Sequence, residues 1–358
     1  MALTKIRPAL TLLAIAAIAL AAAGCSPVIR PAGPATETPR IEEGALIVRD
    51  GVRLPLRSWL PDGRPSAALL ALHSFGDYSA AFERLGPWFA ARGVAVYAYD
   101  QRGFGRAPHP GLWAGTETLV GDLQDAIMAL RPRIPEDAPL YLLGESMGGA
   151  VVMALAGRPG RPDAEGLILA APAVREAVPF RRFWDILLWT GAHTIPWAGR
   201  TVERDDRPRL TETAQERLAR DPLVIRHVRL DTYAGLIDLA DAASAAAARI
   251  DLPTLMLYGT ADASVIPESI CAAAAKLDDA ATTVFYPGRP HLILQSEEDG
   301  VLFRDIAAWM AGGEPPSLEP AESAIPGKKA CGDLAGLVPP TPTAMLIRRT
   351  GAEFPGEA

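Results

Sequence analysis

Short apolar runs alternate with helix-length segments through most of the chain. Runs that are too short for helices predict buried strands at 68–72, 94–99, 140–143, 166–171, 254–258 and 282–286. The segments between and after them have the length and pattern of helices, at 80–91, 118–130, 150–156 and 297–311. Such alternation is typical of a mostly parallel sheet covered by helices on both faces, so the sequence predicts an α/β fold.

The regions around this pattern define the expected domain organisation. Two alternating runs meet at Asp50-Gly51 and predict a β-hairpin, so the folded body is expected over 44–311. Residues 25–43 contain prolines and few large apolar side chains, which predicts a tether. Residues 312–358 are proline-rich and lack periodicity, which predicts a disordered tail.

The strand pattern is interrupted between residues 172 and 250. This segment is helical in character and is predicted to be a cap inserted into the body. Its apolar side chains at Phe180, Phe183, Trp184 and Leu187 recur at helical spacing, which predicts that they pack the cap onto the body, with some of them lining an acyl-binding channel. An alternative is that part of this surface touches a membrane, because two arginines lie beside the aromatics.

Composition and charge narrow the classes of function. The 358 residues are 49% hydrophobic, which is enough for a sizeable core. The formal net charge is −7 and no block of Lys and Arg stands out, so nucleic-acid binding has little support.

The amino terminus has the pattern of a secretory signal. Lys5 and Arg7 precede an apolar run at 9–20 and small residues up to Gly24. The ending Ala22-Ala23-Gly24-Cys25 resembles the lipobox of bacterial lipoproteins.

That resemblance implies a lipoprotein signal peptide at 1–24 and a lipidated Cys25. Serine at position 26 implies sorting to the outer membrane, facing the periplasm. The alternative is an ordinary signal peptide cleaved elsewhere, with Cys25 as a plain thiol. The other two cysteines, Cys271 and Cys331, would then lie in an oxidising compartment, and their spacing leaves open whether they pair.

A serine motif follows the apolar run at 140–143. Gly144 and Gly148 stand two residues before and two after Ser146, as a sharp turn from a strand into a helix requires. Such a nucleophile elbow holds its serine in a strained conformation that exposes the hydroxyl. Gly-x-Ser-x-Gly also occurs by chance in a chain with 32 glycines, so the strand before it and the helix after it are what favour Ser146 as a nucleophile.

A serine nucleophile needs a base and an acid that orients the base. In this kind of sheet the acid follows the next-to-last strand and the histidine follows the last one. Asp262 and His291 occupy these two places. The alternative for Asp262 is a turn or helix cap.

The tetrahedral intermediate of such a reaction needs two donors aimed at its oxyanion. The backbone N–H of Met147 is one candidate, because it directly follows the serine. The N–H of Phe75, in the loop His73-Ser74-Phe75-Gly76 after an early strand, is the other. His73 is expected to hold that loop in shape through side-chain hydrogen bonds.

Together these motifs resemble the α/β-hydrolase superfamily and, within it, the branch of monoacylglycerol lipases, lysophospholipases and serine aminopeptidases. The resemblance covers about 44–311. Its carriers are the segments 73–76, 100–105, 144–149, 221–223, 259–262 and 287–291. It implies a triad of Ser146, Asp262 and His291 and an oxyanion hole of Phe75 and Met147. Ser74 departs from the glycine usual in the family, and its side chain could narrow the site.

The expected function is hydrolysis of carboxylic esters with moderately apolar acyl groups, such as monoacylglycerols or lysophospholipids, through an acyl-enzyme on Ser146. No cofactor or metal is implied. The expected partners are a small ester or lipid and, through Cys25, a membrane; the sequence indicates no protein partner. Alternatives with the same triad are a thioesterase or an aminopeptidase. The latter would hold a substrate amine with acidic groups of the cap, Asp185, Glu203, Asp205 and Asp206.

A further alternative is a lipoprotein without catalytic activity that binds a lipid or a partner through the cap. The presence of all three triad residues argues against it, because a binding protein does not need them.

Overall fold

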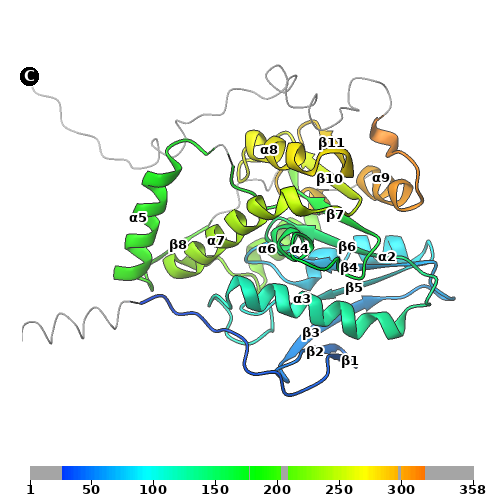
Figure 1. Cartoon of the computed structure of the whole chain (residues 1–358), viewed down its shortest axis with the longest axis horizontal. Helices are drawn as coiled ribbons and strands as arrows, with labels where there is room; N and C mark the ends of the chain where they lie inside the picture. Colours follow the sequence, from blue (N-terminus) through cyan, green and yellow to red (C-terminus); the bar gives the residue numbers. More distant parts are fainter. Residues whose placement is uncertain (1–25, 177, 203–208, 297–299, 319–358) are drawn as a thin grey trace, which may run out of the picture.

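The computed structural model describes residues 26–176, 178–202, 209–296 and 300–318 (Figure 1). A nine-stranded sheet runs through its centre in the order β1-β2-β3-β5-β4-β6-β7-β10-β11. Its strands are β1 (Arg40–Glu42), β2 (Ala45–Ile47), β3 (Arg53–Trp59), β4 (Ala67–Leu72), β5 (Val94–Tyr99), β6 (Leu140–Glu145), β7 (Gly166–Ala170), β10 (Thr254–Gly259) and β11 (Ala281–Tyr286). The strands from β5 to β11 in this order are parallel, and β1 to β3 are antiparallel. The predicted α/β fold is confirmed.

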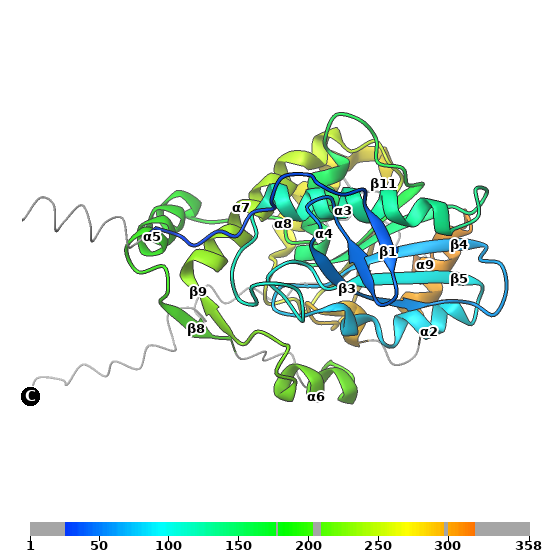
Figure 2. The ribbon, with the colours of Figure 1, turned by 90° about the horizontal axis from the view of Figure 1, so that it is seen from below.

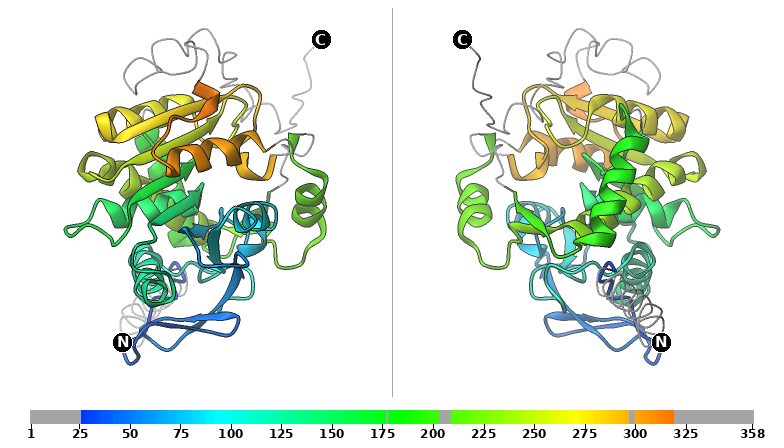
Figure 3. Two further views of the ribbon diagram at one scale, coloured as in Figure 1. Left: turned by 90° about the vertical axis from the view of Figure 1, so that its right-hand side faces the viewer. Right: turned by 90° about the vertical axis from the view of Figure 1, so that its left-hand side faces the viewer.

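Helices cover both faces of this sheet (Figures 1 and 3). On one face lie α3 (Thr116–Leu130), α4 (Met147–Ala156), α7 (Leu230–Ala246) and α8 (Pro267–Leu277), and on the other α2 (Leu85–Ala90) and α9 (Val301–Met310). Successive side chains of a strand point to opposite faces. Leu70 and Leu72 of β4 therefore join the core under α3, α4 and α7, whereas Leu69 packs with α2 and α9.

Short 3-10 helices complete the connections. They are η1 (Ser79–Phe82), η2 (Arg131–Arg133), η4 (Ala247–Arg249), η5 (Asp278–Ala280), η6 (Ile293–Ser296) and η7 (Pro316–Leu318). Two of them, η1 and η6, lie in the loops that follow β4 and β11, which are the loops expected to carry functional residues.

The predicted hairpin is present and continues into an additional strand. β2 pairs with β3, with Leu46 opposite Leu54, and β1 pairs with β2. Figure 3 shows this antiparallel group at one end of the molecule and β11 with α8 and α9 at the other.

The segment before the hairpin, predicted to be a tether, lies against the body (Figure 2). The N–H of Val28 donates to Asp231 on α7 at 3.1 Å, and the N–H of Ala32 donates to the Thr118 hydroxyl on α3 at 3.0 Å. Arg30 donates its N–H to the carbonyl of Trp113. Proline removes backbone donors but leaves the residues between free to pair, so a proline-containing segment can still dock.

The inserted cap consists of α5 (Arg181–Thr194), α6 (Glu212–Arg220) and a small antiparallel sheet of β8 (Gly199–Thr201) and β9 (His227–Arg229). The last helix of the predicted insertion, α7, belongs to the body instead. Its Leu239 and Ala243 are fully buried in the core that contains α4.

The prediction that the aromatic stripe packs the cap onto the body is wrong. Phe180, Phe183, Trp184 and Leu187 are 80%, 61%, 47% and 54% exposed. Helix α5 has one buried residue, Ala192, and it meets α7 with its small residues, because Leu230 lies beside Gly191. Its other large apolar side chains are exposed, except Leu188, which is half-buried. No described helix combines the length and the apolarity needed to cross a bilayer.

Several sequence predictions fall wholly or partly outside the described residues. The signal peptide and Cys25 are among them, as are the cap residues 203–206, the start of the predicted helix at 297–311 and the part of the tail from 319 onward. The described start of the tail packs back on α9, where the Ser317 N–H donates to Asp305 at 3.0 Å. Cys271 on α8 is disulfide-bonded.

Candidate active site

Ser146 lies at the turn between β6 and α4. Its backbone adopts φ 53° and ψ −113°, a strained conformation for a residue with a side chain. A Cβ on Gly148 would lie 2.2 Å from the carbonyl oxygen of Leu72, and a Cβ on Gly144 would lie 2.4 Å from the backbone of Gly148. Both glycines are therefore required by close backbone approach, as the elbow motif predicts.

Ser146, His291 and Asp262 form one chain of hydrogen bonds. The Ser146 Oγ lies 2.8 Å from His291 Nε2, and His291 Nδ1 lies 2.7 Å from Asp262 Oδ2. Because a carboxylate can only accept, Nδ1 carries the proton, which leaves Nε2 as the acceptor of the serine hydroxyl. The imidazole is thus held in the tautomer that can take a proton from Ser146.

The loop after β10 fixes the orientation of Asp262. Its Oδ1 accepts the N–H groups of Ser264 at 2.6 Å and Val265 at 3.0 Å, while Oδ2 faces the histidine. The turn-capping role considered as an alternative therefore coexists with the contact to His291. The Asp262 side chain is fully buried, so water does not compete for these bonds.

The strand topology explains why residues far apart in sequence meet. Ser146 follows β6, Asp262 follows β10 and His291 follows β11, and these parallel strands end at the same edge of the sheet. The loop that contains Phe75 follows β4, the neighbour of β6. All five predicted catalytic and oxyanion-hole residues therefore come from loops at this edge.

The oxyanion side of the site has one donor in a favourable place. Met147 is the first residue of α4, and the first N–H groups of a helix have no partner within it. Phe75 lies in the loop after β4 and packs against Phe104 with the ring centroids 5.4 Å apart. The role of both N–H groups in an oxyanion hole stays a prediction.

His73 holds this loop as expected. The N–H of Gln101 donates to His73 Nε2 at 3.0 Å, so Nδ1 donates to the Ser74 carbonyl at 2.9 Å. Burial lowers the pKa of His73 and keeps it neutral. The hydroxyl of Ser74 is buried and has no hydrogen-bond partner in the described structure.

A second buried carboxylate, which no sequence motif indicates, lies beside the serine. Glu145 ends β6, and it accepts hydrogen bonds from the backbone of Leu294 and the side chain of Gln295, in the loop that carries His291. Burial raises its pKa to about 7, an effect that the nearby charge of Asp77 reinforces. The available signal was an acidic residue at the end of an otherwise apolar strand.

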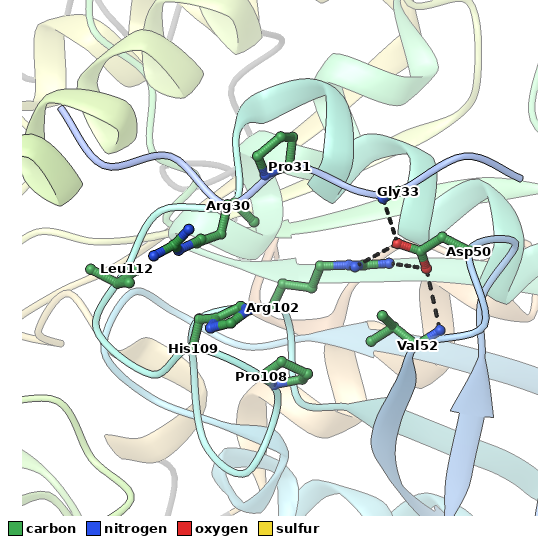
Figure 4. A pocket seen from close by; sticks show the side chains of 11 residues that line it. Arg30, Pro31, Gly33, Asp50, Val52, Arg102, Pro108, His109 and Leu112 are labelled. Carbon is green, nitrogen blue, oxygen red and sulfur yellow. Dashed lines mark hydrogen bonds and ion pairs between the residues drawn. The ribbon is translucent and has the colours of Figure 1, made fainter. Parts of the chain in front are cut away.

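A cavity of about 240 Å³ lies elsewhere, between the docked amino-terminal segment and the 102–114 loop (Figure 4). Its Arg102 binds Asp50 and Asp122, both at 2.7 Å. These paired charges tie the hairpin turn to α3. None of the three hydrogen-bonded residues of the candidate site lines this cavity.

The geometry at Ser146 is that of a nucleophile, a base and an orienting acid. No three His, Cys, Asp or Glu side chains of the described ranges are grouped to hold a metal ion. The family comparison fits this arrangement: the sequence model of the serine aminopeptidase S33 family matches residues 63–299. The chain belongs to this family.

Related proteins of this family include lipases. The chain is 26% identical to a monoacylglycerol lipase of Mycolicibacterium smegmatis over 73% of this chain and 93% of that protein. It is 28% identical to the monoglyceride lipase of Mus musculus, over 61% of this chain and 72% of that protein.

Among solved structures, the monoacylglycerol lipase of Paleococcus ferrophilus matches with a TM-score of 0.58 and 25% identity, over 72% of this chain and 98% of that one. A soluble variant of the Saccharomyces cerevisiae monoglyceride lipase matches the fold with a TM-score of 0.62 at 17% identity, over 80% of this chain and 99% of that one. The chain is thus a hydrolase of the lipase and esterase type.

Proposed function

We propose that the protein hydrolyses carboxylic esters with moderately apolar acyl groups, of the monoacylglycerol or lysophospholipid kind, through an acyl-enzyme on Ser146. The observation that carries the proposal is the hydrogen-bonded chain from Ser146 through His291 to Asp262. The lipases among the relatives support the choice of substrate.

The reaction has two halves. His291 Nε2 takes the proton of Ser146 as Oγ attacks the ester carbonyl carbon, and the N–H groups of Met147 and Phe75 stabilise the oxyanion. The carbon–oxygen bond to the alcohol then breaks, and His291 returns the proton to the leaving oxygen. A water molecule, deprotonated by His291, then attacks the carbonyl carbon of the acyl-enzyme. The bond from this carbon to Ser146 Oγ breaks, His291 returns the proton to Oγ, and the fatty acid leaves.

The exposed face of α5 supports a lipid substrate. Phe183, Trp184, Ile186 and Trp189 are all at least 47% exposed, and a surface of this kind marks a place where an acyl chain or a bilayer makes contact. In this proposal the face receives the substrate from the membrane.

The amino terminus supports attachment to the same membrane. The N–H of Val28 donates a hydrogen bond to Asp231 in the first turn of α7, and α5 packs on α7. The described amino-terminal segment therefore begins close to α5, which carries the exposed apolar side chains (Figure 1). A lipid on Cys25 would hold the protein at a bacterial envelope membrane, the outer membrane facing the periplasm. Metabolic labelling with a fatty-acid analogue should then disappear in Cys25→Ala, and persistent labelling would contradict the anchor.

An aminopeptidase is less well supported. Asp185, one of the acidic residues that could hold a substrate amine, is paired with Arg175 at 2.5 Å and with Arg181 at 3.6 Å. Its charge is therefore already neutralised. The other three, Glu203, Asp205 and Asp206, lie outside the described residues. A thioesterase would use the same atoms at Ser146 and differs only in its leaving group.

The test is hydrolysis of aryl esters from acetyl to decanoyl by the wild type and by Ser146→Ala. We expect kcat/KM to rise with chain length to a medium chain, and Ser146→Ala to lose about 10⁶-fold in kcat. Acyl-thioester and aminoacyl-amide substrates measured alongside distinguish the two alternatives. Equal hydrolysis by the two proteins would refute the proposed function.

A further inference from the structure

Four buried polar residues form a hydrogen-bonded chain that leads away from the candidate site. Asp77, Glu145, Gln295 and Arg217 are each at most about one-tenth exposed in their side chains. They come from the loop after β4, the end of β6, η6 and the cap helix α6. Between them they connect both loops that flank Ser146 with the cap.

Gln295 is the centre of this chain. Its amide nitrogen donates to Glu145 Oε2 at 2.8 Å and to Asp77 Oδ2 at 3.1 Å, and its amide oxygen accepts from Arg217 at 2.7 Å. Because both amide hydrogens and the oxygen have partners, the side chain has one fitting orientation. Gln295 lies four residues after His291, so this orientation restrains the loop that carries the histidine.

The cap holds the loop on the other side of the serine. Arg217 forms two hydrogen bonds with Asp77, one of them at 3.0 Å, in the bidentate geometry of a guanidinium with a carboxylate. The carbonyl of Gly76 accepts the N–H of Ile225, and Tyr78 donates its hydroxyl to Asp221 at 2.6 Å. The segment that contains Phe75 is therefore fixed by residues from and after α6.

Glu145 makes the chain sensitive to protonation. Both of its oxygens accept N–H groups, from Leu294 at 3.1 Å and from Gln295. A protonated carboxyl oxygen is a poorer acceptor, and neither nitrogen donor can receive its hydrogen, so one of these bonds is weakened when Glu145 is neutral. The charged groups that act on Glu145 are Asp77, Arg217 and His291.

We propose that Glu145 and Arg217 are positioning residues for His291. Through the hydrogen bonds of Gln295, the alignment of the histidine depends on the ionisation of Glu145 and on the packing of cap helix α6 against the body. This inference rests on the proposed role of His291 as the base. Ionised Glu145 also stabilises the imidazolium that forms in each half of the reaction, because its negative charge favours the protonated ring.

The test is the pH profile of kcat/KM for a short aryl ester in the wild type, Glu145→Gln and the matched control Glu117→Gln, whose side chain is exposed on α3. Glu145→Gln should lower the plateau at least about tenfold and move the acid limb to lower pH by about half a unit or more. Two effects give this direction: a titrating group is removed, and His291 loses a negative neighbour. An effect on stability alone would lower kcat/KM without moving the limb, and this result would overturn the proposal.

Arg217→Lys tests the cap end of the chain, with Arg220→Lys on the same helix as its control. A lysine cannot hydrogen-bond to Asp77 and Gln295 at the same time. The kcat of Arg217→Lys should therefore fall about tenfold with KM nearly unchanged, and its rate of fluorophosphonate labelling should fall in parallel. Wild-type kcat in Arg217→Lys, or a change in KM alone, would overturn the proposal. If Ser146→Ala is labelled as fast as the wild type, the proposed function itself fails, whatever the pH profiles show. If Glu145→Gln does not fold, the comparison of Arg217→Lys with Arg220→Lys tests the proposal.

Discussion

Glu145 should make the stability of the protein fall as the pH rises. Its carboxyl is fully buried, and its pKa is raised from 4.5 to about 7. Below pH 4.5 the group is protonated in both the folded and the unfolded state. Between pH 4.5 and 7 the folded state still binds a proton that the unfolded state has lost, so the free energy of unfolding declines through this window.

The size of the effect follows from the two pKa values. Each unit of difference in pKa corresponds to about 1.4 kcal/mol. Because the range from pH 5 to pH 8 covers most of the window, the expected change is about 2 to 3 kcal/mol. In Glu145→Gln the group cannot ionise. The free energy of unfolding of the wild type relative to this variant should therefore fall by about that amount from pH 5 to pH 8, whatever the offset between the two proteins at pH 5.

Equilibrium urea unfolding of both proteins, followed by tryptophan fluorescence at pH 5, 6, 7 and 8, measures this difference. Glu117→Gln is the control, because it makes the same substitution at a side chain that is 85% exposed. A wild type that keeps the same offset from Glu145→Gln at every pH, or gains on it with rising pH, would refute the reasoning about burial.

Three further predictions concern the rest of the site. Asp262→Asn should lower kcat on aryl esters about 10⁴-fold, because the histidine loses the partner that fixes its tautomer. The control Asp251→Asn, at an exposed position, should leave kcat unchanged. Equal effects of the two substitutions on kcat would contradict the role of Asp262. Gly148→Ala should lower the midpoint of thermal unfolding sharply or prevent accumulation of folded protein, because the new Cβ would lie 2.2 Å from the carbonyl oxygen of Leu72. The control Gly121→Ala has open space for its Cβ and should be neutral or stabilising by about 0.5 kcal/mol. Comparable midpoints for the two variants would count against the elbow geometry. The double substitution Phe183→Ser and Trp189→Ser should reduce co-sedimentation with phosphatidylglycerol vesicles and the hydrolysis of long-chain esters, but should leave the hydrolysis of acetyl esters unchanged. Met128→Ser, at another exposed apolar residue, is the control. Unchanged binding to the vesicles would argue against α5 as the lipid-facing surface.

The body of the fold could be predicted because its strands are continuous apolar runs. The run at 94–99 coincides with β5, and the run at 166–171 extends one residue beyond β7. Such strands are buried on both faces, so their composition alone identifies them. The order of strands along the chain indicates which loops follow the last two strands, and these loops contain Asp262 and His291.

The remaining features depend on contacts that leave no local pattern. β1, β8 and β9 are three residues long, with two polar residues in each. Helix α7 lies within the segment 172–250, where the sequence shows no strand pattern, yet its alanine-rich face packs on α4. The apolar stripe of α5 has the spacing of a buried helix and is exposed, because tertiary packing decides which face is covered.

The chain from Glu145 to Arg217 could not be predicted for the same reason. Gln295 meets Asp77 across 218 residues of sequence and Arg217 across 78. No periodicity connects these positions. The burial of Glu145, by contrast, had a signal, because an acidic residue that ends an apolar strand must be paired or neutral in the fold.

Fluorophosphonate labelling followed by mapping of the modified peptide tests the central claim most directly. The reagent forms a covalent bond only with a serine that a neighbouring base has activated. We predict one adduct on the wild type, located at Ser146, and no adduct on Ser146→Ala. Labelling of both proteins, or of neither under conditions in which a known serine esterase reacts, would contradict the account.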